Sequence, residues 1–435
     1  MPTVRPSPLP LLLPTMRARN YHLLLASQFL SAFGDNALLW IFLGPLTLQQ
    51  QSGAITEETL RLKSALITAV LYIPFVLLGP FVGYLNDRFA KSHWLAGGNL
   101  IKLAGTGIAM FSLAGGPAWE TIGYFIVGIG SCAYSPAKYG ILPEILPRER
   151  LVKANGSVEM LTLIAILTGM IAGAWMVDQL SPLRCYLIVI GVYGLSLLLN
   201  LFMDRTPSNP AIRLRASVGE FFAHTRGLFG APRLARILVG IGLFWAFGVT
   251  LKVNFQAWGL DVLRLESNTK IAMLGLWLSL GVMAGSMLAG QFYRVSDLRA
   301  VRRNGVLLAA VVMALGLVEV FAPASLARLN VPVLGSLIWP VVLLLAVTGV
   351  AAGLYLIPLN AALQAESDPT KLGKTIAVQN VVDNAAMLVA TALILVGVHF
   401  HYSPSKIFFG LAVLIGGVML WLRIPEPSAT DQTNC

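Results

Sequence analysis

The stretch GYLNDRFAK (residues 83–91) forms a short polar loop between two long apolar segments. A glycine at its start allows neighbouring helices to approach closely. The aspartate can bind the amides of a helix N-terminus or a cation, and the basic residues favour the cytoplasmic side of a membrane. The residues of the loop that carry this chemistry are Gly83, Asp87, Arg88 and Lys91.

The composition around this loop is that of a membrane protein. Of the 435 residues, 56% are hydrophobic and 12% are charged, and the mean hydropathy is +0.75, whereas soluble domains have roughly 25% charged residues. The net charge of +11 is read as an excess of Lys and Arg in cytoplasmic loops, so we expect no nucleic-acid partner. Cys132, Cys185 and Cys435 have no metal-ligand spacing. We therefore expect no metal and no cofactor.

Windows of about 20 apolar residues, the length that crosses a bilayer, number twelve along the chain. The sequence thus predicts an all-α membrane protein with twelve transmembrane helices. Both termini are expected in the cytoplasm, because this places most Lys and Arg residues there. The windows cover residues 21-48, 63-85, 94-114, 119-142, 155-178, 183-203, 236-260, 271-293, 304-323, 333-358, 376-398 and 405-423.

Weak internal repeats divide these spans into two pseudo-symmetric six-helix halves. Residues 31–34 resemble 245–248, and residues 135–138 resemble 357–360, at similar offsets. The repeat pairs Asp35 with Val249. Such duplicated halves form substrate sites near the bilayer midplane and expose them alternately to each side.

The domain boundaries follow from this division. The predicted parts are a cytoplasmic N-terminal tail (1-20), an N-terminal six-helix bundle (21-203), a basic cytoplasmic linker (204-235), a C-terminal six-helix bundle (236-423) and a cytoplasmic tail (424-435). Within the linker, we expect a surface helix around Val218 to Leu228.

With its order of Gly, Leu, Asp-Arg and a following Lys, the loop 83–91 resembles the signature of the major facilitator superfamily. The resemblance implies that Gly83, Asp87, Arg88 and Lys91 serve gating and stability rather than substrate contact. Longer strings go further: residues 28–39, 133–142 and 358–364 are similar to bacterial lysophospholipid transporters, as are 151–156, 248–252 and 376–380. The resemblance covers both halves.

This resemblance implies a transporter rather than an enzyme. It implies movement of lysophosphatidylethanolamine and lysophosphatidylglycerol from the outer to the inner leaflet of the bacterial inner membrane by alternating access. A separate cytoplasmic-side acyltransferase would then restore the diacyl lipid. The acyltransferase motif has a His followed five residues later by an Asp, and no His in this chain is followed in this way. The expected assembly is a monomer in contact with lysophospholipids and membrane lipids.

A lysophospholipid offers a phosphate, a polar headgroup and one acyl chain, and polar residues inside the spans are candidates to bind the first two. Lys138 and Lys252 are suited to phosphate. Asp35 has three open roles: to receive an ethanolamine ammonium, to bind a cation, or to pair with Lys252. Lys102 is expected to extend toward the membrane interface. The substrate-binding candidates are Asp35, Asn36, Lys138, Tyr139, Asn155, Glu159, Lys252, Asn360, Gln364, Gln379, Asn380 and Asp383.

The alternative is a proton-coupled exporter of amphipathic drugs or small solutes, with Asp35, Glu159 or Asp383 as the proton site. Superfamily resemblance does not exclude it, since a fold does not fix a substrate.

Overall fold

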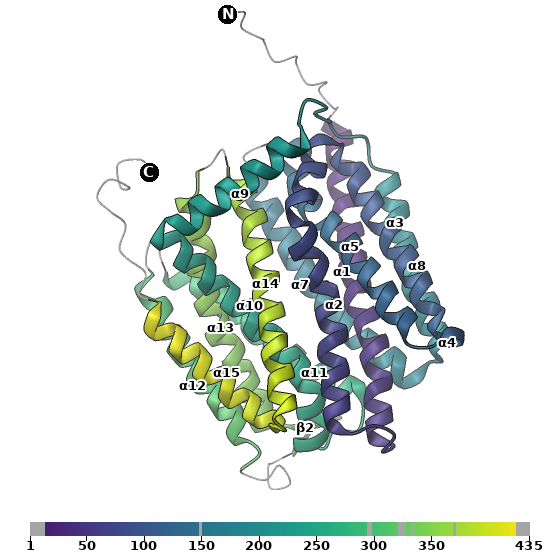
Figure 1. The fold of residues 1–435 in the computed structure, drawn as a ribbon, viewed down its shortest axis with the longest axis vertical. Helices are drawn as coiled ribbons and strands as arrows, with labels where there is room; N and C mark the ends of the chain where they lie inside the picture. Colours follow the sequence, from purple (N-terminus) through teal and green to yellow (C-terminus); the bar gives the residue numbers. More distant parts are fainter. Residues whose placement is uncertain are drawn as a thin grey trace, which may run out of the picture.

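The protein is a bundle of long, nearly parallel helices (Figure 1). The computed structural model describes residues 14–147, 150–293, 298–320, 328–331, 335–368 and 371–422. In the first half, the helices are α1 (Pro14–Gln51), α2 (Glu57–Arg88), α3 (Lys91–Met110), α4 (Ser112–Gly115), α5 (Ala118–Gly140), α6 (Leu142–Ile145), α7 (Leu151–Gln179) and α8 (Pro182–Leu201).

In the second half, the spanning helices are α10 (Pro232–Ala257), α11 (Asn268–Phe292), α12 (Arg299–Leu317), α13 (Trp339–Glu366), α14 (Leu372–His399) and α15 (Pro404–Trp421). A π-helical turn, η2 (Trp258–Val262), extends α10. The helix α9 (Leu214–Gly230) precedes them and lies across one end of the bundle (Figure 1), which confirms the predicted helix between the halves. We call this end the linker end and the opposite end the far end.

The membrane character of the fold is confirmed. Within the described ranges, ten helices are long and apolar enough to cross a membrane. The helices α3 and α5 have 20 and 23 residues, lengths that also fit a span. Polar residues interrupt their apolar sequences, with Asn99 and Lys102 on α3 and Glu120 and Lys138 on α5. Together they complete the two predicted six-helix halves.

Helix packing shows the duplication directly. In the first half, α3 contacts α5 and α8, and α1 contacts α7 and α8. The same relations recur in the second half, where α12 contacts α13 and α15, and α10 contacts α14 and α15. Between the halves, α2 packs against α14 and α7 packs against α11. These two interfaces are also equivalent under the repeat, because α2 corresponds to α11 and α7 to α14.

Small residues allow the tightest of these contacts. On α11, Gly281 and Gly285 are one turn apart and face Gly349 and Gly353 on α13. A Cβ atom on Gly349 would overlap the carbonyl oxygen of Leu278. Membrane helices gain little from hydrophobic burial between them, so close backbone approach at small residues stabilises the pair.

The all-α prediction needs one local correction, between α12 and α13. The strands β1 (Arg328–Val331) and β2 (Gly335–Ile338) pair antiparallel there, with Arg328 opposite Ile338. The window 333-358 had assigned residues 335–338 to a helix, but α13 begins at Trp339. A short apolar run is compatible with either strand or helix, which is why the pattern alone misplaced this boundary.

The linker helix α9 contacts α14 through two side-chain pairs. His224 Nε2 lies 3.0 Å from Thr375 Oγ1, and Glu220 pairs with Lys374. Burial lowers the pKa of His224 from its usual 6.5, and the charges of Lys371 and Lys374 lower it further. With a lowered pKa, His224 binds fewer protons when α9 is docked on α14 than when it is released. Its contribution to the free energy of docking is therefore present above pH 6.5 and is lost as the pH falls through the lowered pKa.

We therefore expect α9 to loosen in mild acid. Amide hydrogen exchange of residues 214–230 should be faster at about pH 5 than at about pH 7.5 after correction for intrinsic rates. The variant His224→Gln should remove this difference. An exchange rate in the unmodified protein that does not vary with pH would contradict the role of His224.

Candidate functional site

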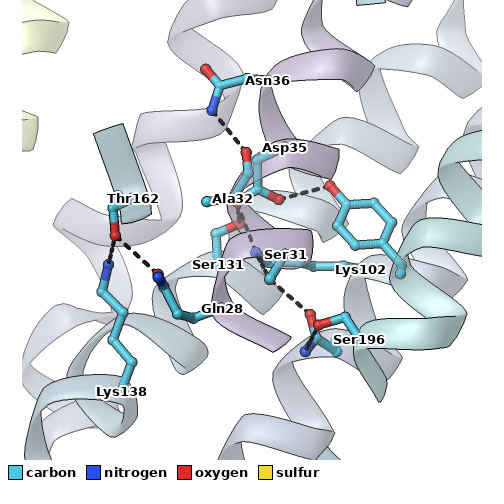
Figure 2. Close-up of polar contacts among 12 residues, drawn as sticks. Gln28, Ser31, Ala32, Asp35, Asn36, Lys102, Ser131, Lys138, Thr162 and Ser196 are labelled. Atoms are coloured by element: carbon cyan, nitrogen blue, oxygen red, sulfur yellow. Dashed lines mark hydrogen bonds and ion pairs between the residues drawn. The ribbon is translucent and has the colours of Figure 1, made fainter. Parts of the chain in front are cut away.

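A buried ion pair lies at the centre of the first half (Figure 2). Lys102 Nζ on α3 is 2.7 Å from Asp35 Oδ2 on α1, and the lysine side chain is 2% exposed. Two hydroxyl groups also donate to the carboxylate: Ser131 Oγ to Oδ2 at 3.2 Å and Tyr193 OH to Oδ1 at 2.7 Å. The carboxylate is therefore both neutralised and hydrogen-bonded within one half, as a buried charge requires.

A hydrogen-bond chain continues from this ion pair across α1, α3 and α8. Lys102 Nζ donates to Ser31 Oγ at 2.8 Å, and Ser31 Oγ donates to Asn99 Oδ1 at 2.8 Å. Asn99 Nδ2 in turn donates to Ser196 Oγ at 2.8 Å. The rings of Tyr134 and Tyr193 lie 5.3 and 5.8 Å from Lys102 Nζ. The chain fixes the relative positions of the three helices.

These contacts correct one expectation and exclude one of the three roles left open for Asp35. Lys102 does not reach the membrane interface, because its ammonium group is enclosed by Asp35 and Ser31. Asp35 forms its ion pair with Lys102 and not with Lys252. Sequence gives the depth of each charge but not the face of the helix on which it lies, so it left this choice open.

Lys252 belongs to the second half and contacts Asn36, the residue after Asp35, in the first half. Its Nζ atom on α10 lies 3.4 Å from Asn36 Oδ1 on α1, a long hydrogen bond, and the charge of Asp35 attracts the ammonium group from farther away. Asn36 Nδ2 donates to Ala32 O at 2.9 Å, which orients the amide oxygen. Within the described ranges, no carboxylate forms an ion pair with Lys252. This half-buried cation lies between the two halves.

Lys138 and Tyr139 lie toward the linker end, in the last turn of α5. Lys138 Nζ is 3.5 Å from Thr162 Oγ1 on α7 and 4.7 Å from the centre of the Tyr139 ring. Thr162 Oγ1 donates to Gln28 Oε1 on α1 at 2.9 Å (Figure 2). The structure thus brings Lys138 and Tyr139 together with a polar pair that was not predicted.

The candidates on α13 and α14 form a second group. Gln379 Nε2 donates to Asn360 Oδ1 at 3.1 Å, and Asn384 Nδ2 donates to Asn380 O at 2.7 Å. Asp383 is 5% exposed, and its Oδ1 atom accepts no hydrogen bond among the described residues. An unsatisfied buried carboxyl oxygen is costly, which makes Asp383 a candidate for a proton, cation or ammonium.

Three candidates remain. Gln364 is exposed near the C-terminal end of α13. Asn155 and Glu159 lie on α7, and their side chains are outside the described part of the structure.

The loop 83–91 is tied to its surroundings by its basic residues. Arg88 Nη1 donates to Ile212 O in the linker at 2.8 Å, and Lys91 forms an ion pair with Glu144 on α6. The expected close helix approach at Gly83 is wrong, because no atom lies within 4 Å of a Cβ built there. The side chain of Asp87 is outside the described part of the structure.

The two halves are joined at the far end by buried polar contacts that were not predicted. Gln256 on α10 donates from Nε2 to Leu43 O at 2.7 Å and to Thr47 Oγ1 at 2.6 Å, and its Oε1 accepts from Ser64 Oγ at 2.6 Å. Gln256 is 2% exposed. The sequence signal for this contact was a polar residue in an apolar helix, close to the end of a span. The same pattern is expected for a side chain solvated at the membrane interface, so it did not identify the contact.

Asp178 makes the second far-end contact between the halves. Its Oδ2 accepts from Thr269 N at 2.9 Å and Thr269 Oγ1 at 2.6 Å, and its Oδ1 accepts from Asn268 N at 3.2 Å and Asn268 Nδ2 at 2.9 Å. The carboxylate of α7 thus binds the N-terminus of α11, where the helix dipole favours negative charge. Together with an apolar cluster that includes Trp40 and Ile271, these contacts join the two halves at the far end.

Comparisons with known proteins agree with this geometry. A family model described as Major Facilitator Superfamily matches residues 24–334. The lysophospholipid transporter LplT of Klebsiella pneumoniae (strain 342) is 32% identical over 419 residues, 94% of this chain and 98% of the relative. LplT of Yersinia pestis (strain Pestoides F) is 34% identical over 375 residues, 85% of each chain.

The fold is also found among solved structures. A POT family transporter, crystallised with a thioalcohol-conjugated peptide, superposes with a TM-score of 0.70 at 15% identity. The alignment covers 93% of this chain and 95% of that one. At this identity the likeness concerns the fold alone.

Proposed function

Because the chain belongs to the major facilitator superfamily and, within it, to the family of the bacterial lysophospholipid transporter LplT, we propose that it moves lysophospholipids across the membrane by alternating access. The substrates in this proposal are lysophosphatidylethanolamine and lysophosphatidylglycerol. Both carry a phosphate, one acyl chain and a small polar headgroup. The transport direction is from the outer to the inner leaflet of a bacterial inner membrane.

The observation that carries this proposal is that Asp35 has a counter-ion, whereas Lys252 forms no ion pair with the described residues. Lys102 already neutralises Asp35, whereas the side-chain contact of Lys252 among the described residues is the 3.4 Å contact to Asn36. An ammonium group that lacks an acid partner in a partly desolvated position favours an anionic ligand. We assign the lipid phosphate to Lys252, with Asn36 beside it. Asp35 positions the first half rather than binding the headgroup.

The remaining polar groups support a path from Lys252 to the linker end. Asp383 lies about three turns into α14, counted from the linker end, and its free carboxyl oxygen suits an ethanolamine ammonium. Asn360, Gln379 and Lys138 lie beyond it, closer to the linker end. With the far end closed, a lipid on this path is delivered toward the linker.

The direction follows from the charge of the linker. Residues 204–235 carry Arg205, Arg213, Arg215, Arg226 and Arg233, so the positive-inside rule places the linker end and both termini in the cytoplasm. In this proposal the lipid leaves the path at the linker end, on the cytoplasmic side. A separate acyltransferase on the cytoplasmic side would consume the delivered lipid, and a monomer is sufficient for the path.

One observation favours the exporter alternative, namely Asp383. A buried carboxyl group with a free oxygen is also what proton coupling uses. The two functions differ in their substrates and in their response to a collapsed proton gradient, so the same assay separates them.

The test follows labelled lysophosphatidylethanolamine in spheroplasts that contain this protein and a cytoplasmic acyltransferase. We expect conversion to diacyl lipid above the vector control. The variant Lys252→Ala should lower the rate by about tenfold or more, since a charge-assisted hydrogen bond to phosphate is worth roughly 1.5–3 kcal/mol. Lys252→Arg should retain most of the activity, because it keeps the cation and offers a bidentate grip.

The matched control is Lys270→Gln, an exposed lysine at the far end, which should transport normally. Protein amounts in the membrane are measured for every variant. Conversion at the level of the vector control would refute lysolipid transport, and full activity of Lys252→Ala would remove this residue from the path. Loss of conversion with an uncoupler would favour proton coupling.

A further inference from the structure

A cavity lies in the first half, apart from the polar groups described above. It has a volume of about 750 Å³ and lies near the far end, between α1, α2 and the segment from α4 to the start of α5. None of its lining residues contacts Asp35 through a hydrogen bond. Volumes of roughly 300–1,000 Å³ are typical of pockets that enclose one small ligand.

The walls of this cavity are mostly apolar. Phe42 and Leu46 contribute from α1, and Leu66, Ile67 and Val70 contribute from α2. Leu66 is 48% exposed, so the cavity is open at the surface of the bundle. In a membrane, such an opening faces lipid rather than water, and an acyl chain is the ligand that this wall accepts.

Two opposite charges lie on the same cavity. Glu120 on α5 accepts hydrogen bonds at Oε1 from Ser112 Oγ and Tyr186 OH, both at 3.3 Å, and no ion pair to it is formed by the described residues. Lys63 on α2 is exposed and likewise forms no ion pair within the described ranges. An acid and a base that both line a cavity without pairing complement a zwitterionic ligand.

We propose that this cavity is a peripheral docking site for lysophosphatidylethanolamine, distinct from the central site at Lys252. Glu120 binds the ethanolamine ammonium, Lys63 binds the phosphate, and the single acyl chain lies along α1 and α2. The inference rests on the proposed function, because it names the site at which the same substrate binds before the far end opens.

The position of the cavity supports this order of events. Leu46 and Ile67 line the cavity and also pack into the apolar cluster that includes Ala257 and Leu260 of the second half. A lipid in the cavity therefore contacts the same residues that close the far end. A docked substrate is adjacent to the interface that must separate to admit it.

The experiment uses the full-length protein in lipid nanodiscs and two photoreactive probes, each with a diazirine in the acyl chain. One probe is lysophosphatidylethanolamine and the other is lysophosphatidylglycerol. Crosslinked peptides are identified by mass spectrometry. We expect labelling of residues 42–49 and 63–73, in addition to labelling near Lys252.

Substitutions at the cavity test the contacts separately. Leu66→Trp fills the cavity and should lower this labelling about tenfold with both probes, whereas Leu62→Trp, one turn earlier on α2 and 44% exposed, should not. Glu120→Gln should lower labelling by the ethanolamine probe about tenfold and leave the glycerol probe unchanged, because only the first has an ammonium group. Lys63→Gln should weaken both probes, and the control Lys270→Gln neither.

The outcomes separate this inference from the proposed function. Equal labelling of Leu66→Trp and Leu62→Trp, or no effect of Glu120→Gln on the ethanolamine probe, would overturn the docking site, even if transport depends on Lys252. Specific labelling of the cavity without any lysolipid transport would keep the site and refute the function. Loss of signal in a misfolded variant is recognised by its elution from size-exclusion chromatography.

Discussion

Replacing Lys102 with methionine is expected to destabilise the protein severely. The substitution keeps most of the side-chain volume but leaves the partly buried carboxylate of Asp35, 19% exposed, without its counter-ion. Removing one partner of a buried ion pair costs about 3–5 kcal/mol, and Ser131 and Tyr193 compensate only part of this through their hydrogen bonds. The measurement is the thermal unfolding of the detergent-solubilised protein, followed by loss of the monodisperse peak.

The double variant Asp35→Asn with Lys102→Met provides the control. It removes both charges, and the amide oxygen of Asn still accepts from Tyr193, so it should be more stable than Lys102→Met alone. The two single variants and the double variant form a cycle that measures the coupling between the side chains. A Lys102→Met protein as stable as the parent would show that the ion pair does not stabilise the folded protein.

Removal of the Asp178 carboxylate is expected to open the far end. The variant Asp178→Ala loses the four hydrogen bonds to Asn268 and Thr269 and the negative charge at the N-terminus of α11. A net change of about 2 kcal/mol would shift the balance between closed and open far ends about 30-fold. Because these contacts connect the two halves, the change affects the conformation more than the stability of either half.

Opening of the far end is measured at Ala272, which is 1% exposed in the cluster between the halves. A single cysteine is placed there after Cys132, Cys185 and Cys435 are replaced, and its labelling by an impermeant maleimide is timed. Asp178→Ala should raise the rate about 30-fold if closing is fast relative to labelling. Glu266→Gln, at an 88% exposed carboxylate of the same end, should not. Unchanged labelling in Asp178→Ala would mean that Asp178 does not hold the halves together.

The helices and the two halves follow from the sequence because they depend on local patterns. An apolar window of sufficient length predicts a span whatever its neighbours are, and this holds for 21-48 as for 405-423. The repeat also located a useful position: Lys252, one turn beyond Val249, does face α1 of the other half at Asn36. Most of the fold was therefore predictable from the local apolar patterns and the internal repeat.

The charge pairing could not be derived in the same way. Asp35 and Lys102 are far apart in sequence, and whether they meet depends on the rotation of α3 about its axis, which packing at Gly98 and Gly105 against α5 determines. A rule that pairs each intramembrane acid with a base at similar depth would have included Lys102 among the partners of Asp35. The contacts that Asp178 and Gln256 make between the halves also could not be predicted. Each is a single polar residue near the end of a span, and a residue solvated at the membrane interface has the same sequence pattern.

The pairing of Asp35 with Lys102 has a consequence for the electrical work of transport. Moving one elementary charge through the full membrane potential involves about 2.3 kcal/mol per 100 mV. The carboxylate and the ammonium belong to the same half and are 2.7 Å apart, so they move together as a neutral unit when the halves rock. With the phosphate on Lys252, that cation is balanced as well. The conformational cycle with a lipid bound therefore transfers little net charge from these residues, and the membrane voltage neither drives nor opposes it through them.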